Sequence, residues 1–160
     1  METYPIFFSF KEVIACGRFK GLIKANGRAL LVFEDEKWWM HGVQPGGMSA
    51  SADTPEAAFN EFSNAFGNIL RDIAGETDCP NKFEKTVRKF FDTIDEEDEK
   101  VWLRSRKRIR SGKQSVPRKL GKLKKVKEEC DSSISIIVAD KDDIKEENII
   151  QEEDRYSAAA

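Results

Sequence analysis

A capped, strongly amphipathic helix that directly follows a short strand constrains this chain more than any other feature of its sequence. Thr54 can cap the helix through its hydroxyl, Pro55 suits the first helical position, and Glu56 puts negative charge at the positive end of the helix dipole. Spacings of three and four then place apolar side chains on one face: Phe59, Phe62, Phe66, Ile69 and Ile73. We expect this face to pack against a sheet.

The residues before this helix predict strands. Phe19 to Ala25 and Arg28 to Phe33 flank Asn26-Gly27, which favours a two-residue hairpin turn because both residues can adopt positive φ. Further strands are predicted over Trp38 to Val43 and Met48 to Ala52, which gives the order β-β-β-β-α. Ile6 to Ala15 is another candidate strand, although its apolar pattern does not alternate cleanly.

Helical spacing returns after this unit, where Phe83, Val87, Phe90, Phe91 and Ile94 predict a second helix that ends near Ile94. It would cover the sheet edge or a dimer partner, so we expect a homo-oligomer. A third, short helix is considered around Val101 to Leu103. The predicted fold class is α+β: an antiparallel sheet of three to four strands packed by one long amphipathic helix, a second helix following, and a charged C-terminal arm and tail.

Charge divides the chain of 160 residues into three blocks. Residues 1–103 carry 12 basic and 18 acidic side chains, residues 104–127 carry 12 basic and none acidic, and residues 128–160 carry 3 basic and 11 acidic ones. Folding a core does not require such segregation, so we expect a folded domain over 1–103, a flexible basic arm over 104–127 and an acidic tail over 128–160.

The basic arm is the strongest binding signal, because clustered cations neutralise phosphates and release counterions. The arm contains no aromatic residue and no clear helix-turn-helix pattern, so neither base stacking nor sequence-specific recognition of bases is predicted. In the alternative interpretation the acidic tail folds over the arm and masks it. The predicted nucleic-acid contacts, to DNA or RNA, are Arg104, Arg106, Lys107, Arg108, Arg110, Lys113, Arg118, Lys119, Lys122, Lys124 and Lys125.

Two apolar features are candidate surfaces for a protein partner. In a strand, Trp38 and Trp39 point to opposite faces, so one can enter the core while the other anchors an interface; alternatively, both faces are covered. The β-prone segment Ser133 to Ala139 can join the sheet of its own domain, a second copy or a partner. The predicted partner contacts are Trp38, Trp39, Ile134, Ile136 and Val138.

Catalytic chemistry is not predicted. His41 is the sole histidine and lies in a predicted strand, where a packed or surface role is the more common one. Gly46-Gly47 lacks the pattern of a phosphate-binding loop, and Asp95 to Glu99 reads as a solvated acidic run. Cys16, Cys79 and Cys130 have neither zinc-site spacing nor the even number of a disulfide framework. No metal and no cofactor is expected.

Residues at the start of the long helix resemble the HicB antitoxin family. The matching residues are Gly47, Asp53, Thr54, Glu56, Ala58 and Ala65. The family's usual Gly, second Glu and turn Cys are replaced by Ala52, Ala57 and Met48, and its turn Pro is matched only by the displaced Pro45. The resemblance covers roughly Ala29 to Ala74. It implies a reduced ribonuclease H-like fold and an antitoxin that neutralises an RNA-cleaving, HicA-type toxin and binds its own promoter. The usual C-terminal DNA-binding domain of the family is not recognisable here.

Together these features predict a non-catalytic binding protein of HicB-like type. No apolar run approaches the length of a membrane span, and the start of the chain lacks the pattern of a secretion signal, so we expect a cytoplasmic protein without a membrane partner. The alternatives are a stand-alone nucleic-acid-associated or phage-type accessory protein that uses the basic arm, and a scaffold that dimerises.

Overall fold

The computed structural model describes residues 2–17, 19–120, 132–140 and 155–159. Its elements are β1 (Thr3–Cys16), β2 (Phe19–Glu34), β3 (Lys37–Gln44), β4 (Gly46–Ala52), α1 (Pro55–Glu76), α2 (Pro80–Asp92), α3 (Glu96–Arg110), a 3-10 turn (Arg118–Leu120), β5 (Ser133–Asp140) and β6 (Arg155–Ala158). The fold is α+β with an antiparallel sheet, as predicted. Within the described residues the sheet has six strands, which is more than the three to four expected, and three α-helices accompany it.

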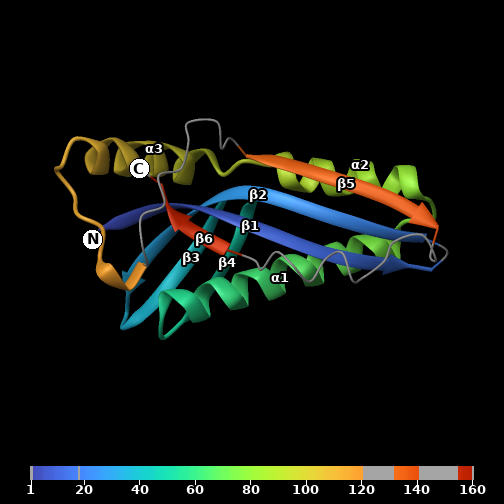
Figure 1. Ribbon diagram of the computed structural model, residues 1–160, viewed down its shortest axis with the longest axis horizontal. Coiled ribbons are helices and arrows are strands. Elements are labelled where there is room, and N and C mark those ends of the chain that lie inside the picture. Colours follow the sequence, from blue (N-terminus) through green and yellow to red (C-terminus); the bar gives the residue numbers. More distant parts are fainter. Residues whose placement is uncertain (1, 18, 121–131, 141–154, 160) are drawn as a thin grey trace.

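The two longest strands, β1 and β2, form the centre of the sheet (Figure 1). The strand order is β4-β3-β2-β1-β6, and β5 pairs with β2 away from this path. β2 therefore has two successive neighbours on one edge: its residues 19–26 pair with β5, and its residues 28–34 pair with β3. The change of neighbour falls at Gly27.

The predicted hairpin at Asn26-Gly27 is wrong, because β2 runs straight through this pair and stays paired with β1. The reason is packing: a Cβ on Gly27 would lie 2.4 Å from the Phe8 ring and 2.5 Å from the Gln44 carbonyl oxygen. Glycine is needed here for close approach rather than for a turn. The β1–β2 hairpin turns instead between Cys16 and Phe19, where Gly17 has a φ of +54°.

The acidic tail contributes to the sheet, so the charge blocks do not correspond to separate structural units. β5 pairs with β2, β6 pairs with β1, and Ala158 and Ala159 are buried. The folded part of the chain therefore extends beyond the domain predicted over 1–103. Much of the tail's acidic charge lies in residues 128–131 and 141–154, outside the described residues, so its masking of the basic arm stays a prediction.

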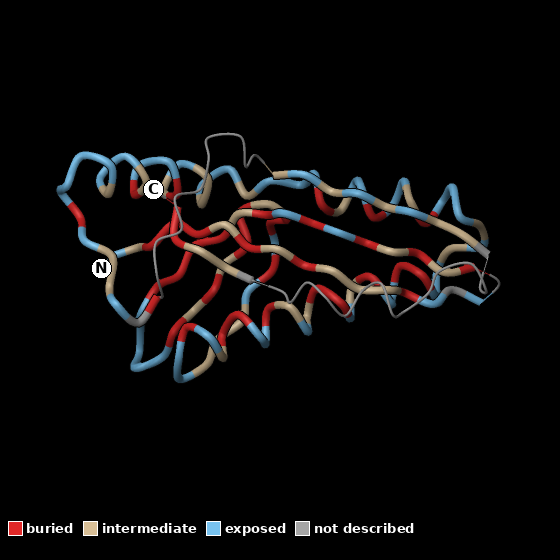
Figure 2. Tube along the Cα trace, in the orientation of Figure 1, coloured by how far each residue is buried: buried red, intermediate tan, exposed pale blue. Residues whose placement is uncertain are grey.

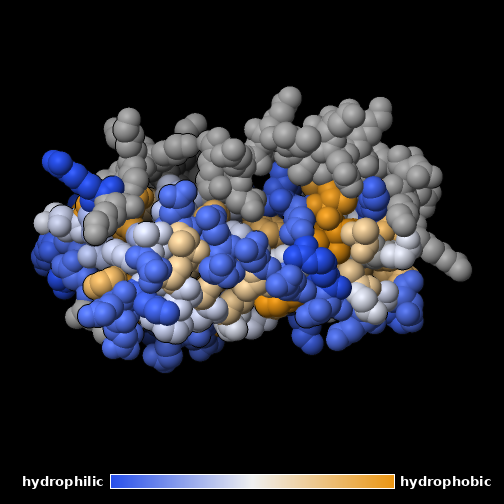
Figure 3. Space-filling view, turned by 90° about the horizontal axis from the view of Figure 1, so that it is seen from below, coloured by the Kyte–Doolittle hydropathy of each residue, from blue (hydrophilic) through white to orange (hydrophobic). Residues whose placement is uncertain are grey.

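The main core lies between one face of the sheet and helices α1 and α2. Alternate residues of β1 point into it, with Tyr4, Ile6, Phe8 and Phe10 all buried. From α1, the rings of Phe62 and Phe66 meet Phe8 edge-on. Figure 2 shows this pattern as buried stretches along the strands and on the inward sides of the helices. Seen from below, the outer surface is mostly hydrophilic, with smaller hydrophobic areas (Figure 3).

Helix α1 begins as predicted, since the Thr54 hydroxyl accepts a hydrogen bond of 3.1 Å from the Ala57 amide. We expect Thr54→Ala to lower the free energy of unfolding by about 1 kcal/mol, because one amide at the helix start loses its acceptor. Urea denaturation followed by circular dichroism measures this loss. Thr54→Ser keeps the hydroxyl and should leave stability unchanged; an equal loss in both variants would contradict the capping role.

Between α2 and α3 the chain crosses from one face of the sheet to the other. The crossing is fixed to the β3–β4 turn, because the Gly46 amide donates to the Thr93 carbonyl oxygen and the Asp95 amide donates to that of Val43. A Cβ on Gly46 would lie 2.5 Å from the Asp95 amide nitrogen, which explains a glycine at this position. α2 ends at Asp92, close to the predicted end near Ile94.

α3 packs on the face of the sheet opposite the main core. Trp102 forms a second buried cluster with Leu30, Val32, Val43 and Ala159. This helix extends to Arg110, so the first part of the predicted basic arm is not a flexible segment but a helix that contacts the sheet. The sequence gives little sign of this helix length. The inward face of α3, formed by Val101, Trp102, Ser105 and Ile109, contains few apolar residues and lies beside many charged ones.

Candidate nucleic-acid interface

Trp102 fixes the helix that carries the predicted nucleic-acid contacts. Its indole N–H donates a hydrogen bond of 3.2 Å to the Ile6 carbonyl oxygen, and its ring meets that of Phe7 edge-on with 5.2 Å between the centroids. Two guanidinium groups lie over the indole, those of Arg28 at 5.3 Å and Arg106 at 5.4 Å from its centroid. Position and rotation of α3 are therefore set by buried contacts.

Arg106, one of the predicted phosphate contacts, is engaged within the fold. Its guanidinium lies over both Trp102 and Phe7, and the residue is only partly exposed. A cation that packs on two aromatic rings gives up these contacts if it turns toward a phosphate. We therefore assign Arg106 to the packing of α3 rather than to the outer surface.

Arg28 forms a polar contact that the sequence did not reveal. It lies just after the point where β2 changes neighbours, and it joins three parts of the chain: Glu99 of α3 at 2.8 Å, Gln44 of β3 at 3.2 Å and the Ser132 hydroxyl at 3.0 Å. The Arg28 side chain is 15% exposed and that of Glu99 is 31% exposed. This ion pair therefore reinforces the Trp102 contact between α3 and the sheet.

The remaining cations of the described arm face solvent. We call the exposed ones the outer cations: Arg104, Lys107, Arg108, Arg110, Lys113 and Arg118. None of them forms an ion pair within the part of the chain that the structure describes. The Lys119 side chain and the residues Lys122, Lys124 and Lys125 lie outside the described residues. The acidic residues of α3 occupy its first turn, at the other end of the helix.

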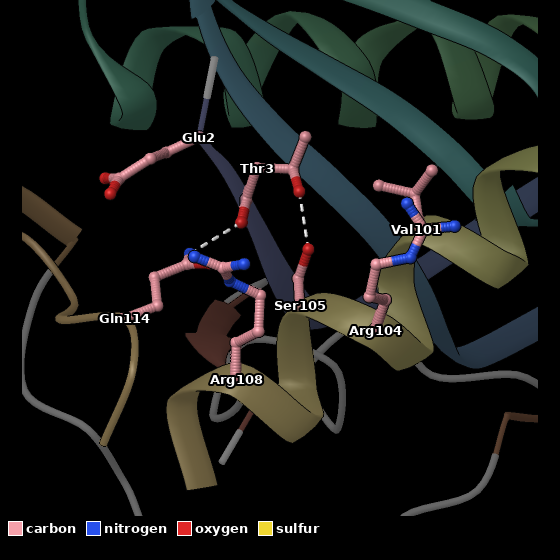
Figure 4. A pocket seen from close by; sticks show the side chains of 7 residues that line it. All are labelled: Glu2, Thr3, Val101, Arg104, Ser105, Arg108 and Gln114. Carbon is pink, nitrogen blue, oxygen red and sulfur yellow. Dashed lines mark hydrogen bonds between the residues drawn. The ribbon is translucent and has the colours of Figure 1, made fainter. Parts of the chain in front are cut away.

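A small open cavity, which we call the α3 hollow, lies between α3, the start of β1 and the turn after α3. Its volume is about 350 Å³, and it is lined by Glu2, Thr3, Val101, Arg104, Ser105, Arg108 and Gln114. The Thr3 and Ser105 hydroxyls are hydrogen-bonded to each other, and the Gln114 amide donates to the Thr3 carbonyl oxygen at 2.8 Å (Figure 4). The lining is thus polar apart from Val101.

The acidic residue at the α3 hollow turns its side chain away. In Figure 4 the Glu2 carboxylate points to the left, away from Arg104. This carboxylate accepts a hydrogen bond of 2.7 Å from the Tyr4 hydroxyl. Burial, together with this hydrogen bond to Glu2, raises the pKa of Tyr4 to about 12, so the hydroxyl keeps the proton that it donates. Of the charged residues that line the hollow, Glu2 is thus engaged by Tyr4, whereas Arg104 and Arg108 form no ion pair within the described residues.

The predicted partner contacts are distributed differently from the expectation. Trp38 is buried and packs against Tyr4, whereas Trp39 is partly exposed on the other face and stacks on His41, so the prediction of one tryptophan on each face is confirmed. The segment Ser133 to Ala139 joins the sheet of its own domain. Its side chains Ile134, Ile136 and Val138 are partly buried and pack against the main core, whereas Ile137, 52% exposed, points outward. A role of the three residues in partner binding stays a prediction.

His41 lies on the sheet surface. Its Nδ1 is 2.7 Å from the Ser49 hydroxyl oxygen, and these two residues are directly opposite in the β3–β4 pairing. Asp98 lies near this pair: burial, and then the charge of Asp95, raise the pKa of Asp98, while His41 lowers it. The contact between His41 and Ser49 is ordinary for cross-strand neighbours.

The described residues contain neither a candidate metal cluster nor a candidate membrane-spanning helix. No group of three or more His, Cys, Asp or Glu side chains there lies close enough to hold a metal ion. None of the helices described combines the length and the apolar character needed to cross a bilayer.

Comparison with known proteins gives no family for this chain. No family model, no curated protein and no solved structure matches it.

Proposed function

We propose that this protein binds nucleic acid through the outer cations, without catalysing a reaction on it. The observation that supports this proposal is the concentration of six exposed cations on the second half of α3 and on the residues that follow it, none of which forms an ion pair with another described residue. Several exposed cations along one segment can each meet a phosphate, and the released counterions supply the affinity. Such binding is weakly selective for sequence.

The alternative explanation of these charges is helix stability. Cations in the last turn of a helix interact favourably with its dipole, typically by about 0.3–1 kcal/mol each. That effect accounts for Lys107, Arg108 and Arg110 in the last turn. It does not account for Lys113 and Arg118, which lie beyond the end of the helix and are also exposed.

Oligonucleotide binding at increasing salt tests the proposal. We expect the triple variant Lys107→Ala, Arg110→Ala and Lys113→Ala to bind less tightly than the unmodified protein, and the slope of log affinity against log salt to fall by about 3, roughly one per lost phosphate contact. Fluorescence anisotropy with single-stranded RNA, single-stranded DNA and duplex DNA, each about 20 nucleotides long, measures both quantities and identifies the preferred partner.

A charge-matched control separates site from net charge. Lys82, Lys85 and Lys89 are exposed on α2, and replacing all three by alanine removes the same charge from another helix. We expect this control to keep its affinity and its salt slope. Equal losses in both triple variants, or no binding by the unmodified protein, would refute the proposal.

A second candidate function is toxin neutralisation of the HicB type, and it is favoured by the corner between β4 and α1. The residues that resemble the family have definite positions there: Thr54 caps α1, Ala58 is fully buried in the core, and Gly47 has a φ of +76°.

The test of this second candidate is biochemical. A small basic protein encoded beside this one would be co-expressed with it, purified as a complex and assayed for RNA cleavage with and without this chain. Stoichiometric binding that suppresses cleavage supports the antitoxin role. Two soluble proteins that elute separately and leave cleavage unaffected would exclude it for that pair.

A further inference from the structure

We infer that the α3 hollow is a binding site for a single phosphate group, held by Arg104 and Arg108 over the hydroxyls of Thr3 and Ser105. This inference rests on the proposed function and deepens it, because it assigns one phosphate of the bound strand to a defined place. The outer cations elsewhere on α3 then supply affinity without a fixed geometry.

The spacing of the two arginines suits a shared anion. They are four residues apart on α3 and are therefore neighbours on the same side of the helix. Figure 4 places them on either side of Ser105, and both are exposed, so their long side chains can turn toward the space between them. A planar guanidinium presents paired N–H groups that match the oxygens of a phosphate.

The floor of the hollow supplies two further donors. The Gln114 amide group has two N–H bonds, and one of them is used by the Thr3 carbonyl oxygen. Thr3 and Ser105 share one hydroxyl proton in their mutual hydrogen bond, which leaves the second proton for another acceptor. Gln114 and Ser105 are buried, so the positions of these donors are fixed before any ligand arrives.

The end of a helix normally disfavours an anion, because its last carbonyl oxygens carry partial negative charge. Here the Arg108 carbonyl oxygen accepts hydrogen bonds from the amides of Lys113 and Gln114 and from the Ser111 hydroxyl. The carbonyl oxygen of Arg108, one of the lining residues, is thereby satisfied. The turn that satisfies it also places the Gln114 side chain at the wall of the hollow.

The size and chemistry of the hollow indicate what it can accept. A volume of about 350 Å³ lies at the lower end of the range of ligand pockets, which is roughly 300–1,000 Å³. Val101 is the apolar part of the lining and offers little surface on which a base could stack. A phosphate with part of its sugar fits this lining better than a base does. The phosphate can be the terminal group of a strand or an internal one.

The experiment compares two double variants that remove equal charge from the same helix. Arg104→Ala with Arg108→Ala removes the two arginine side chains that line the hollow, whereas Lys107→Ala with Arg110→Ala leaves both of them in place. We expect the first to weaken oligonucleotide binding about tenfold more than the second, because charge-assisted hydrogen bonds in fixed geometry are lost only there. Equal losses would overturn the inference. Thermal unfolding followed by circular dichroism verifies that both variants remain folded.

Two further ligands identify the source of the phosphate. If a 5′-phosphorylated oligonucleotide binds the unmodified protein more tightly than its 5′-hydroxyl counterpart, and the Arg104→Ala, Arg108→Ala variant loses this preference, the hollow takes a terminal phosphate. If the preference is absent but the two double variants still differ, it takes an internal one. Both results support the inference.

Inorganic phosphate tests the hollow independently of nucleic acid. Saturable changes in the amide NMR signals of Thr3, Ser105 and Gln114, absent in the Arg104→Ala, Arg108→Ala variant, support a phosphate site even if no oligonucleotide binds and the proposed function fails. Signals that do not change, or that change equally in that variant, overturn the inference even if oligonucleotides bind.

Discussion

Replacing Trp102 by alanine should lower the free energy of unfolding by about 3–5 kcal/mol, the usual cost of removing a large buried aromatic side chain. Trp102 is 1% exposed and forms the centre of the cluster between α3 and the sheet. The substitution also leaves the Ile6 carbonyl oxygen without its indole donor and removes the ring under the guanidinium groups of Arg28 and Arg106. Each of these losses adds to the cost of the cavity.

Urea denaturation followed by far-ultraviolet circular dichroism measures this effect without relying on tryptophan fluorescence. The neighbouring Leu103 is 51% exposed, so Leu103→Ala is a matched control with an expected change within about 0.5 kcal/mol. Trp102→Phe should lie between the two, because it keeps an aromatic ring and loses the indole donor. A loss below about 1 kcal/mol for Trp102→Ala would show that α3 is not anchored as described.

Phe66→Ala should produce a loss of similar size, about 3–5 kcal/mol, on the opposite face of the sheet. Phe66 is fully buried on α1, and its ring lies 4.4 Å from that of Phe10 and 5.9 Å from that of Phe90, measured between centroids. It therefore joins α1 to both β1 and α2, and no single neighbour can move to fill the space that it leaves.

The control for this second prediction is Asn64→Ala, an exposed position on the same helix whose replacement should leave stability within about 0.5 kcal/mol. Chemical denaturation of both variants gives the comparison. If Phe66→Ala cost less than about 1 kcal/mol, the Phe-rich face of α1 would not form the main core.

Local chemistry explains which parts of the fold could be predicted. Thr54, Pro55 and the spacing of the Phe residues specify α1 within one short stretch, so this helix was found with its correct start. The strands predicted over Trp38 to Val43 and Met48 to Ala52 agree with β3 and β4 to within two residues at each end. These features depend on residues that are close together in the sequence, so they can be predicted from the sequence alone.

The predictions from sequence failed where residues far apart in the chain determine the structure. Asn26-Gly27 has the composition of a turn, but the Phe8 ring and the pairing with β1 hold it in a straight strand. The candidate site shows the same limit. The α3 hollow combines the first residues of β1 with residues about 100 positions later, and neither Thr3 nor Gln114 stands out in the sequence. The cations of α3 were found because charge is visible without knowledge of the fold.

The pairing of β1 and β2 with the last two strands has a consequence for how the chain folds during synthesis. β1 can form its hairpin with β2 as soon as Glu34 has left the ribosome, but its other edge has to wait for β6 at Arg155–Ala158. Until then the backbone groups of residues 6–9 that later pair with β6 remain available to other strands. Contacts so far apart in sequence form slowly, so we expect this exposed edge to be the part of the nascent protein that most needs a chaperone.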